Sequence, residues 1–107
     1  METSARNTPA PACVPGAIPA AERAAHFDLV ARLFGGDARE KRALENGYEF
    51  RFDAAAFEDV ARFVANEREC CPFLDFEIDV GAEDGAVRLR LTGPEGTREF
   101  LEAELPG

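Results

Sequence analysis

The sequence predicts a single α+β domain, a two-layer sandwich in which a four-stranded antiparallel sheet carries its helices on one face. Two segments, residues 37–52 and 74–91, each contain a pair of stretches that read as strands. Each pair is followed by a stretch with helical spacing, and a further helical stretch precedes both pairs. We therefore expect the order α-ββα-ββα over residues 13–107, after a disordered N-terminal tail at residues 1–12.

The first helix is predicted over residues 19–34. Proline at position 19 suits a first helical turn, because the N–H that it lacks would have no partner there. Gly35-Gly36 is expected to end the helix in the left-handed conformation. His26 lies at the edge of the apolar face and belongs to no motif, which predicts a packed or surface histidine rather than a ligand. The apolar face itself is expected to contain Phe27, Val30, Leu33 and Phe34.

A hairpin is predicted next. Asn46-Gly47 favours a tight two-residue turn, because both residues tolerate positive φ. Residues 48–52 alternate aromatic and charged side chains, so this strand should bury one face. The strand before the turn is mostly charged, which predicts a strand at the edge of the sheet.

The second helix is expected to begin at Asp53, whose carboxylate can accept hydrogen bonds from the first backbone N–H groups. Its apolar stripe leads to Cys71, while Cys70 lies on the neighbouring stripe. Pro72 ends the helix, because the residue before a proline is pushed towards extended geometry. The two thiols are thus expected at the corner between helix and strand, with Cys70 the more available. The stripe is expected to consist of Phe57, Val60, Ala61, Val64 and Arg68.

The second strand pair has the clearest alternation in the chain. Residues 74–80 alternate apolar with acidic side chains, and residues 87–91 alternate apolar side chains with arginines. Acids opposite arginines favour antiparallel pairing. A last helix is expected to begin within residues 92–95, where a proline and an acid stand in its first turn. Its inner face should contain Phe100, Leu101 and Leu105.

Charge and composition narrow the classes of function. The net charge of −9 disfavours nucleic acid and anionic membranes as partners, and it is compatible with a cationic ligand. No apolar run approaches the roughly 20 residues of a membrane span, and the N-terminus lacks the pattern of a secretory signal. Three cysteines, two of them adjacent, do not resemble a secreted disulfide framework. We expect a cytoplasmic protein whose thiols are reduced.

The cysteines Cys13, Cys70 and Cys71 leave four interpretations open. The adjacent pair can be small core residues, because free cysteine is among the most buried residue types. All three sulfurs can instead converge on a soft ion such as Hg(II) or As(III), with Zn(II) or Cu(I) less suited. Cys13 can form a disulfide with either of the others, whereas the adjacent pair can form only a strained ring. Nucleophilic catalysis is disfavoured, because a helix C-terminus opposes a thiolate.

Two motifs resemble a known group of proteins. Residues 67–73 read ERECCPF and residues 89–96 read LRLTGPEG. These motifs are similar to those of a largely uncharacterised family of small bacterial proteins, in which an ERxCCPF helix end precedes an LRLTGPEG strand-to-helix turn. Some members lie beside mercury- or arsenic-responsive regulators. The resemblance covers nearly the whole chain after residue 12 and implies soft-metal handling at Cys13, Cys70 and Cys71, with Glu67, Arg68 and Glu69 as neighbours.

The leading hypothesis is a thiolate protein that binds Hg(II) or As(III) through these three cysteines and sequesters or delivers the ion in heavy-metal resistance. No obligatory cofactor is expected, and a protein partner or a homodimer is left open. One alternative is an organomercurial-type or thiol-dependent enzyme in which Glu67, Glu69 or Asp75 donates a proton. The other is a thiol redox or regulatory-interaction module. The residues favour a binding protein over an enzyme.

Overall fold

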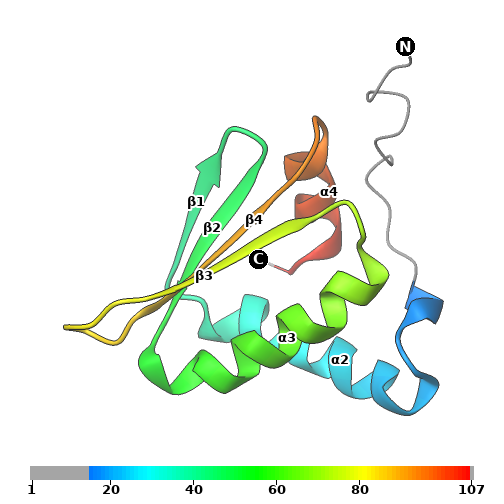
Figure 1. Cartoon of the computed structure of the whole chain (residues 1–107), viewed down its shortest axis with the longest axis horizontal. Helices are drawn as coiled ribbons and strands as arrows, with labels where there is room; N and C mark the ends of the chain where they lie inside the picture. Colours follow the sequence, from blue (N-terminus) through cyan, green and yellow to red (C-terminus); the bar gives the residue numbers. More distant parts are fainter. Residues whose placement is uncertain (1–14, 107) are drawn as a thin grey trace.

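The computed structural model, which describes residues 15–106, has the predicted α+β fold and the order α-ββα-ββα. Four antiparallel strands form one sheet in the order β1-β2-β4-β3, and the helices cover one of its faces (Figure 1). The tail predicted at residues 1–12 and the cysteine at position 13 lie outside the described residues. Within residues 15–106, no helix is long and apolar enough to cross a membrane. The elements are α2 (Ala20–Arg32), β1 (Glu40–Leu44), β2 (Gly47–Phe52), α3 (Phe57–Cys70), β3 (Asp75–Val80), β4 (Val87–Thr92) and α4 (Thr97–Glu104).

The buried face of α2 is rotated by one residue from the predicted one. His26 and Leu29 are buried, whereas Phe27 is 52% exposed and Val30 is half-buried. His26, Leu29 and Leu33 follow one another at helical spacing, so they form the face that meets the core. The prediction that Phe27 belongs to the core was wrong.

The two glycines do not end the helix in the left-handed conformation. They lie inside a wider turn, η2 (Leu33–Asp37), and neither Gly35 nor Gly36 has a positive φ. The N–H of Ala38 donates to the carbonyl of Leu33 at 2.9 Å, which is a bond across five residues. Such bonds widen the helix into a π-type turn, and here they carry it as far as Asp37.

The first hairpin turns one residue earlier than predicted. Leu44 pairs with Gly47, so the turn consists of Glu45 and Asn46 and Gly47 is the first residue of β2. A Cβ at Gly47 would lie 1.9 Å from the carbonyl oxygen of Leu91. Glycine is therefore required at this position because β4 approaches closely, and not because of the turn. The prediction that β1 is an edge strand is confirmed.

The starts of α3 and α4 also differ from the prediction. Asp53 makes no capping hydrogen bond, because its carboxylate accepts from the guanidinium of Arg39 at 2.8 Å. A short 3-10 turn, η3 (Ala54–Ala56), follows it, and only then does α3 begin. α4 begins after Gly96, whose φ of 96° is left-handed, so the predicted start within residues 92–95 was too early.

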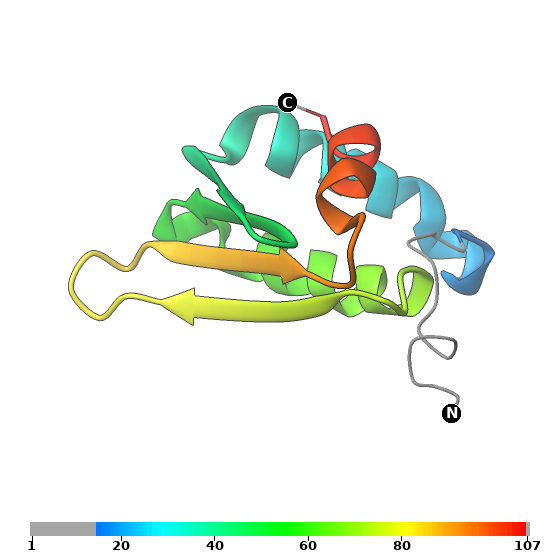
Figure 2. The ribbon, with the colours of Figure 1, turned by 90° about the horizontal axis from the view of Figure 1, so that it is seen from above.

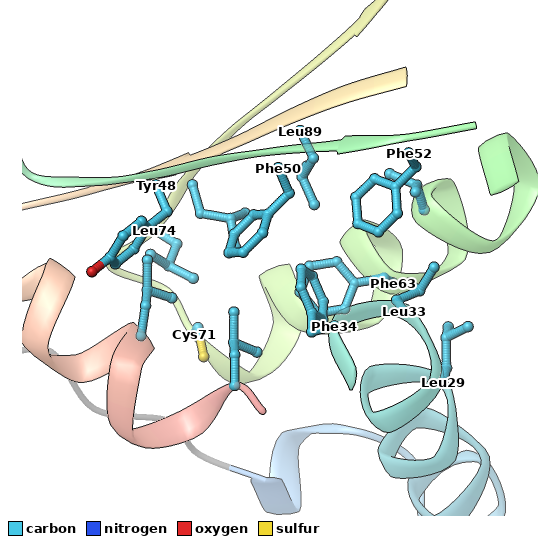
Figure 3. Close-up of a cluster of buried hydrophobic side chains, with 14 of the residues drawn as sticks. Leu29, Leu33, Phe34, Tyr48, Phe50, Phe52, Phe63, Cys71, Leu74 and Leu89 are labelled. Atoms are coloured by element: carbon cyan, nitrogen blue, oxygen red, sulfur yellow. The ribbon is translucent and has the colours of Figure 1, made fainter. Parts of the chain in front are cut away.

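The core lies between the sheet and the helices and is built on phenylalanine (Figure 3). The ring of Phe34 packs edge-on against Phe50, Phe52 and Phe63, at centroid distances of 4.8, 5.9 and 4.9 Å. Cys71 lies in the same buried cluster (Figure 3). β4 contributes the predicted inward row of Val87, Leu89 and Leu91.

β3 is less buried than its alternation predicts. Phe76 is half-buried, but Ile78 and Val80 are 37% and 50% exposed. The hairpin of β3 and β4 extends past the helices (Figure 2), so the far half of this edge strand has little beneath it. The predicted pairing of acids with arginines is confirmed, because Glu77 stands opposite Arg90 and Asp79 opposite Arg88 in register.

Candidate metal centre

The buried stripe of α3 ends in one of the two adjacent cysteines. The predicted stripe is rotated by one position, so Cys70 lies on the core face and Phe57 is 43% exposed. Both cysteines are buried, at 4% exposed for Cys70 and 0% for Cys71. Cys70 also lines a small pocket, so the prediction that it is the more available of the two agrees with the structure. The observed stripe is Val60, Phe63, Glu67 and Cys70.

The end of the helix explains how two consecutive cysteines can both face inward. On a regular helix, neighbouring side chains point about 100° apart. α3 ends at Cys70, and Cys71 takes extended geometry with φ of −122° and ψ of 76° before Pro72, as the proline predicts. This bend turns the second side chain back towards the first, and the two Sγ atoms lie 3.6 Å apart.

Glu67 brings a carboxylate to the same point. Its Oε1 lies 3.7 Å from the sulfur of Cys70, and its Oε2 lies 3.1 Å from the sulfur of Cys71. One oxygen and both sulfurs lie within 4.8 Å of one another, which is close enough for one ion to contact all three. Of the three acids predicted as proton donors, the structure places Glu67 beside the sulfurs, whereas Glu69 and Asp75 are exposed.

His26 lies behind this carboxylate. Its Nε2 is 2.9 Å from Oε1 of Glu67. Its ring stacks on that of Phe63, with 5.9 Å between the ring centroids. Its Nδ1 is buried and has no hydrogen-bond partner within residues 15–106. Of the two predicted alternatives, a packed or a surface histidine, the structure shows the packed one. The contact with Glu67 was not predicted. The spacing of His26, Leu29 and Leu33 on one helical face is the signal that could have predicted its burial.

The surroundings of the Glu67 carboxyl group disfavour its charged form relative to an exposed glutamate. Burial raises the pKa of Glu67, because a charge there has lost most of its water, and the hydrogen bond with His26 opposes that shift. A positive ion beside the carboxylate would lower the same pKa. Binding of a cation and release of a proton are therefore linked at this corner.

The two cysteines differ in redox state. Cys70 is a reduced thiol, whereas Cys71 is disulfide-bonded. Cys13, the remaining cysteine of the sequence, lies outside the described residues, so its role as a third ligand stays a prediction. Because the thiolate is the ligand form of cysteine, Cys71 can bind an ion only after reduction.

A small pocket of about 70 Å³ reaches the corner. His26, Glu67 and Cys70 line one part of it, and apolar side chains such as Val30 and Leu105 line another. It lies between α2, α3 and the end of α4, on the side of the corner where Cys70 lies.

No protein family, no curated protein and no solved structure matches this chain. The case for the site therefore depends on its own geometry. The resemblance to the family with the ERxCCPF motif stays a prediction.

Proposed function

We propose that the reduced protein binds a soft, thiophilic ion at the end of α3 and sequesters or delivers it. The ligands are the thiolates of Cys70 and Cys71 and an oxygen of Glu67, with Cys13 as a third sulfur. The observation that supports this function is the convergence of two sulfurs and one carboxylate oxygen within 4.8 Å in a buried corner. Thiolates bind soft ions, whereas calcium and magnesium bind oxygen ligands. The pair of sulfurs therefore favours a soft ion.

The separation of the two sulfurs favours one geometry over another. Two bonds of about 2.3 Å, the length of a zinc–thiolate bond, would span about 4.6 Å if the ion lay on the line between the sulfurs. The observed 3.6 Å corresponds instead to an angle of about 100° at the ion. Pyramidal As(III) and tetrahedral ions have such angles, whereas Hg(II) held linearly by two thiolates does not. We therefore place trivalent arsenic ahead of mercury.

The reaction with arsenite is a condensation that needs no oxidant. Arsenous acid, As(OH)₃, reacts with two thiols to form two As–S bonds and release two waters, and a third thiol releases a third water. Arsenic stays trivalent throughout. His26 would hold the Glu67 carboxylate in place during this step, as hydrogen-bonded partners hold ligands at other metal sites.

Titration of the reduced full-length protein with arsenite, followed by calorimetry in competition with dithiothreitol, tests the proposal. We expect one ion per chain, bound more tightly than by dithiothreitol. Cys70→Ser and Cys71→Ser should each abolish that advantage. Glu67→Gln should weaken binding about tenfold or more, whereas Glu69→Gln, a matched change at an exposed acid of the same helix, should not change it.

Two outcomes would contradict parts of this proposal. An affinity no greater than that of dithiothreitol would exclude the function. Equal binding by the wild type and by a Cys13→Ser variant would remove Cys13 from the ligand set and leave the two sulfurs of the corner with Glu67.

A second candidate function is a thiol redox module, and the state of Cys71 favours it. The sulfur of Cys70, a reduced thiol, lies 3.6 Å from the sulfur of Cys71, which is already in a disulfide. The thiolate of Cys70 can attack that sulfur, form a Cys70–Cys71 bond and displace the former partner as a thiolate, with no net oxidation. Mass spectrometry of the protein as isolated, after alkylation of free thiols, distinguishes this state. Three alkylated cysteines would exclude a stable disulfide.

A further inference from the structure

The strand β3 forms one edge of the sheet. Within residues 15–106, β4 pairs with one of its sides and no strand pairs with the other. An edge strand presents a row of backbone N–H and C=O groups, which is a template for a further strand. The side chains of β3 indicate what kind of strand fits.

The helix-facing side of β3 is apolar and only half covered. Ile78 stands opposite Leu89 and Val80 opposite Val87 in register, and directly opposite residues point to the same face. Leu89 and Val87 are fully buried. Ile78 and Val80 remain 37% and 50% exposed, because the hairpin extends beyond the helical layer (Figures 1 and 2). A fifth strand with apolar residues on this face would cover them.

The other face of the sheet carries a row of alternating charge. In register, Arg42 stands beside Glu49, Glu49 beside Arg90, and Arg90 beside Glu77. The successive ion pairs measure 3.0, 2.7 and 3.7 Å. The row ends at the edge with Glu77, whose side chain is 71% exposed. A fifth strand that continued the alternation would place a lysine or arginine next to Glu77.

The same charges disfavour a second copy of this edge. The outward side chains of β3 are Asp75, Glu77 and Asp79, and all of them are acidic. Two such strands paired with one another would bring acids opposite acids, which is destabilising. The β1 edge of another copy fits little better, because its outward residues are Glu40, Arg42 and Leu44. The complement of β3 is a strand that alternates apolar and basic residues.

We propose that the β3 edge binds an extended segment of another protein, in which apolar residues alternate with lysine or arginine, as a fifth strand of the sheet. Backbone hydrogen bonds along the edge supply affinity, and the alternating side chains supply specificity. Apolar residues of the segment cover Ile78 and Val80, and its basic residues continue the row at Glu77 and Asp79. This surface is separate from the cysteine corner and does not depend on the ion.

A labelled peptide of alternating lysine and valine, eight residues long, provides the probe, and fluorescence anisotropy with the full-length protein measures its binding. A control peptide has the same composition with the lysines and valines in two blocks. We expect the alternating peptide to bind at least about tenfold more tightly than the blocked one. Glu77→Lys should weaken the alternating peptide about five- to tenfold, because an opposite-charge pair becomes a like-charge pair. Glu58→Lys, the same change at an exposed acid of α3, should leave the affinity within about twofold.

Amide hydrogen exchange locates the peptide, with protection expected in β3. Equal binding of both peptides, or equal loss in both variants, would mean that net charge alone attracts them and would overturn the proposal. Protection outside β3 would also overturn it. So would self-association in analytical ultracentrifugation that Glu77→Lys changes, because the edge would then pair with a second copy.

Discussion

Glu67 and Glu49 both have largely buried side chains, but their pKa values are shifted in opposite directions. Burial alone would raise the pKa of Glu49, but hydrogen bonds from Arg42 and Arg90 outweigh it and hold that pKa below its usual range. Burial raises the pKa of Glu67, and the hydrogen bond with His26 only partly opposes that shift. One carboxylate stands between two guanidinium groups, and the other stands between a histidine and two sulfurs.

The opposite pKa shifts indicate which of the two carboxylates stabilises the fold. Two permanent cations beside Glu49 make its charge favourable in the folded state. At Glu67 the hydrogen bond with His26 does not outweigh the effect of burial, and a buried carboxylate is costly unless its charge is compensated. A positive ion held by the carboxylate and the two thiolates would compensate it. We interpret Glu67 as a residue kept for binding and Glu49 as a residue kept for stability.

Removal of its hydrogen-bond partner should affect Glu67 most. We expect His26→Ala to destabilise the reduced protein by about 2–4 kcal/mol, because it leaves a buried carboxyl group with a lost partner and opens a cavity beside Phe63. Urea denaturation followed by circular dichroism measures the change. The expected loss of stability is larger than for removal of either arginine beside Glu49, because both arginines are partly exposed.

A second variant separates the hydrogen bond from the packing. His26→Phe keeps a ring against Phe63 but removes the nitrogen that bonds to Glu67. It should still lose about 1–3 kcal/mol, the usual cost of a buried polar group left without its partner. Stability equal to that of the wild type would show that the ring matters and the bond does not.

The two carboxylates should also respond to pH with opposite signs. The folded pKa of Glu49 is lowered, so its contribution is present above the pKa of the unfolded chain, about 4.3, and is lost as pH falls through the folded value. The folded pKa of Glu67 is raised, so its contribution is complete below about pH 4.3 and is lost as pH rises through the folded value.

Denaturation of Glu49→Gln and Glu67→Gln between pH 3 and 8 measures this contrast. The stability of the wild type relative to Glu49→Gln should increase with pH and reach about 0.5–1 kcal/mol near neutrality. Its stability relative to Glu67→Gln should decrease over the same range. All samples need the same thiol state, because Cys71 contacts Glu67. Slopes of equal sign would remove the distinction between the two regions.

The fold could be predicted from the sequence because its signals are periodic and local. Alternation in β2 and β4, the charge match between β3 and β4, and Pro72 at the end of α3 all agree with the structure. The rotation of the helices could not be predicted in the same way. Phe27 and Phe57 are more hydrophobic than His26 and Glu67, and yet the first two are exposed and the last two are buried.

The candidate site was predicted only in part for the same reason. The adjacent cysteines and the corner after Pro72 are visible in the chain. The contact of His26 with Glu67 joins residues 41 positions apart and arises from the packing of α2 on α3. Spacing shows which residues share a helical face, but it does not show which residue of a second helix lies opposite. The close approach of Leu91 to Gly47 is likewise a contact between strands, which a turn motif cannot reveal.

The smallest expected effect is at the outer end of the charge row. Arg42 donates to Glu49 at 3.0 Å, but its own side chain is 64% exposed on the edge strand β1. Arg90 donates to the same carboxylate at 2.7 Å from the centre of the sheet and is 31% exposed. Exposed ion pairs contribute little, so Arg42→Ala should cost no more than about 0.5 kcal/mol and Arg90→Ala somewhat more. Because Arg90 remains in the first variant, part of the lowering of the Glu49 pKa should remain there. If Arg42→Ala alone abolished the pH dependence measured against Glu49→Gln, the two arginines would act as one unit and the row would be cooperative.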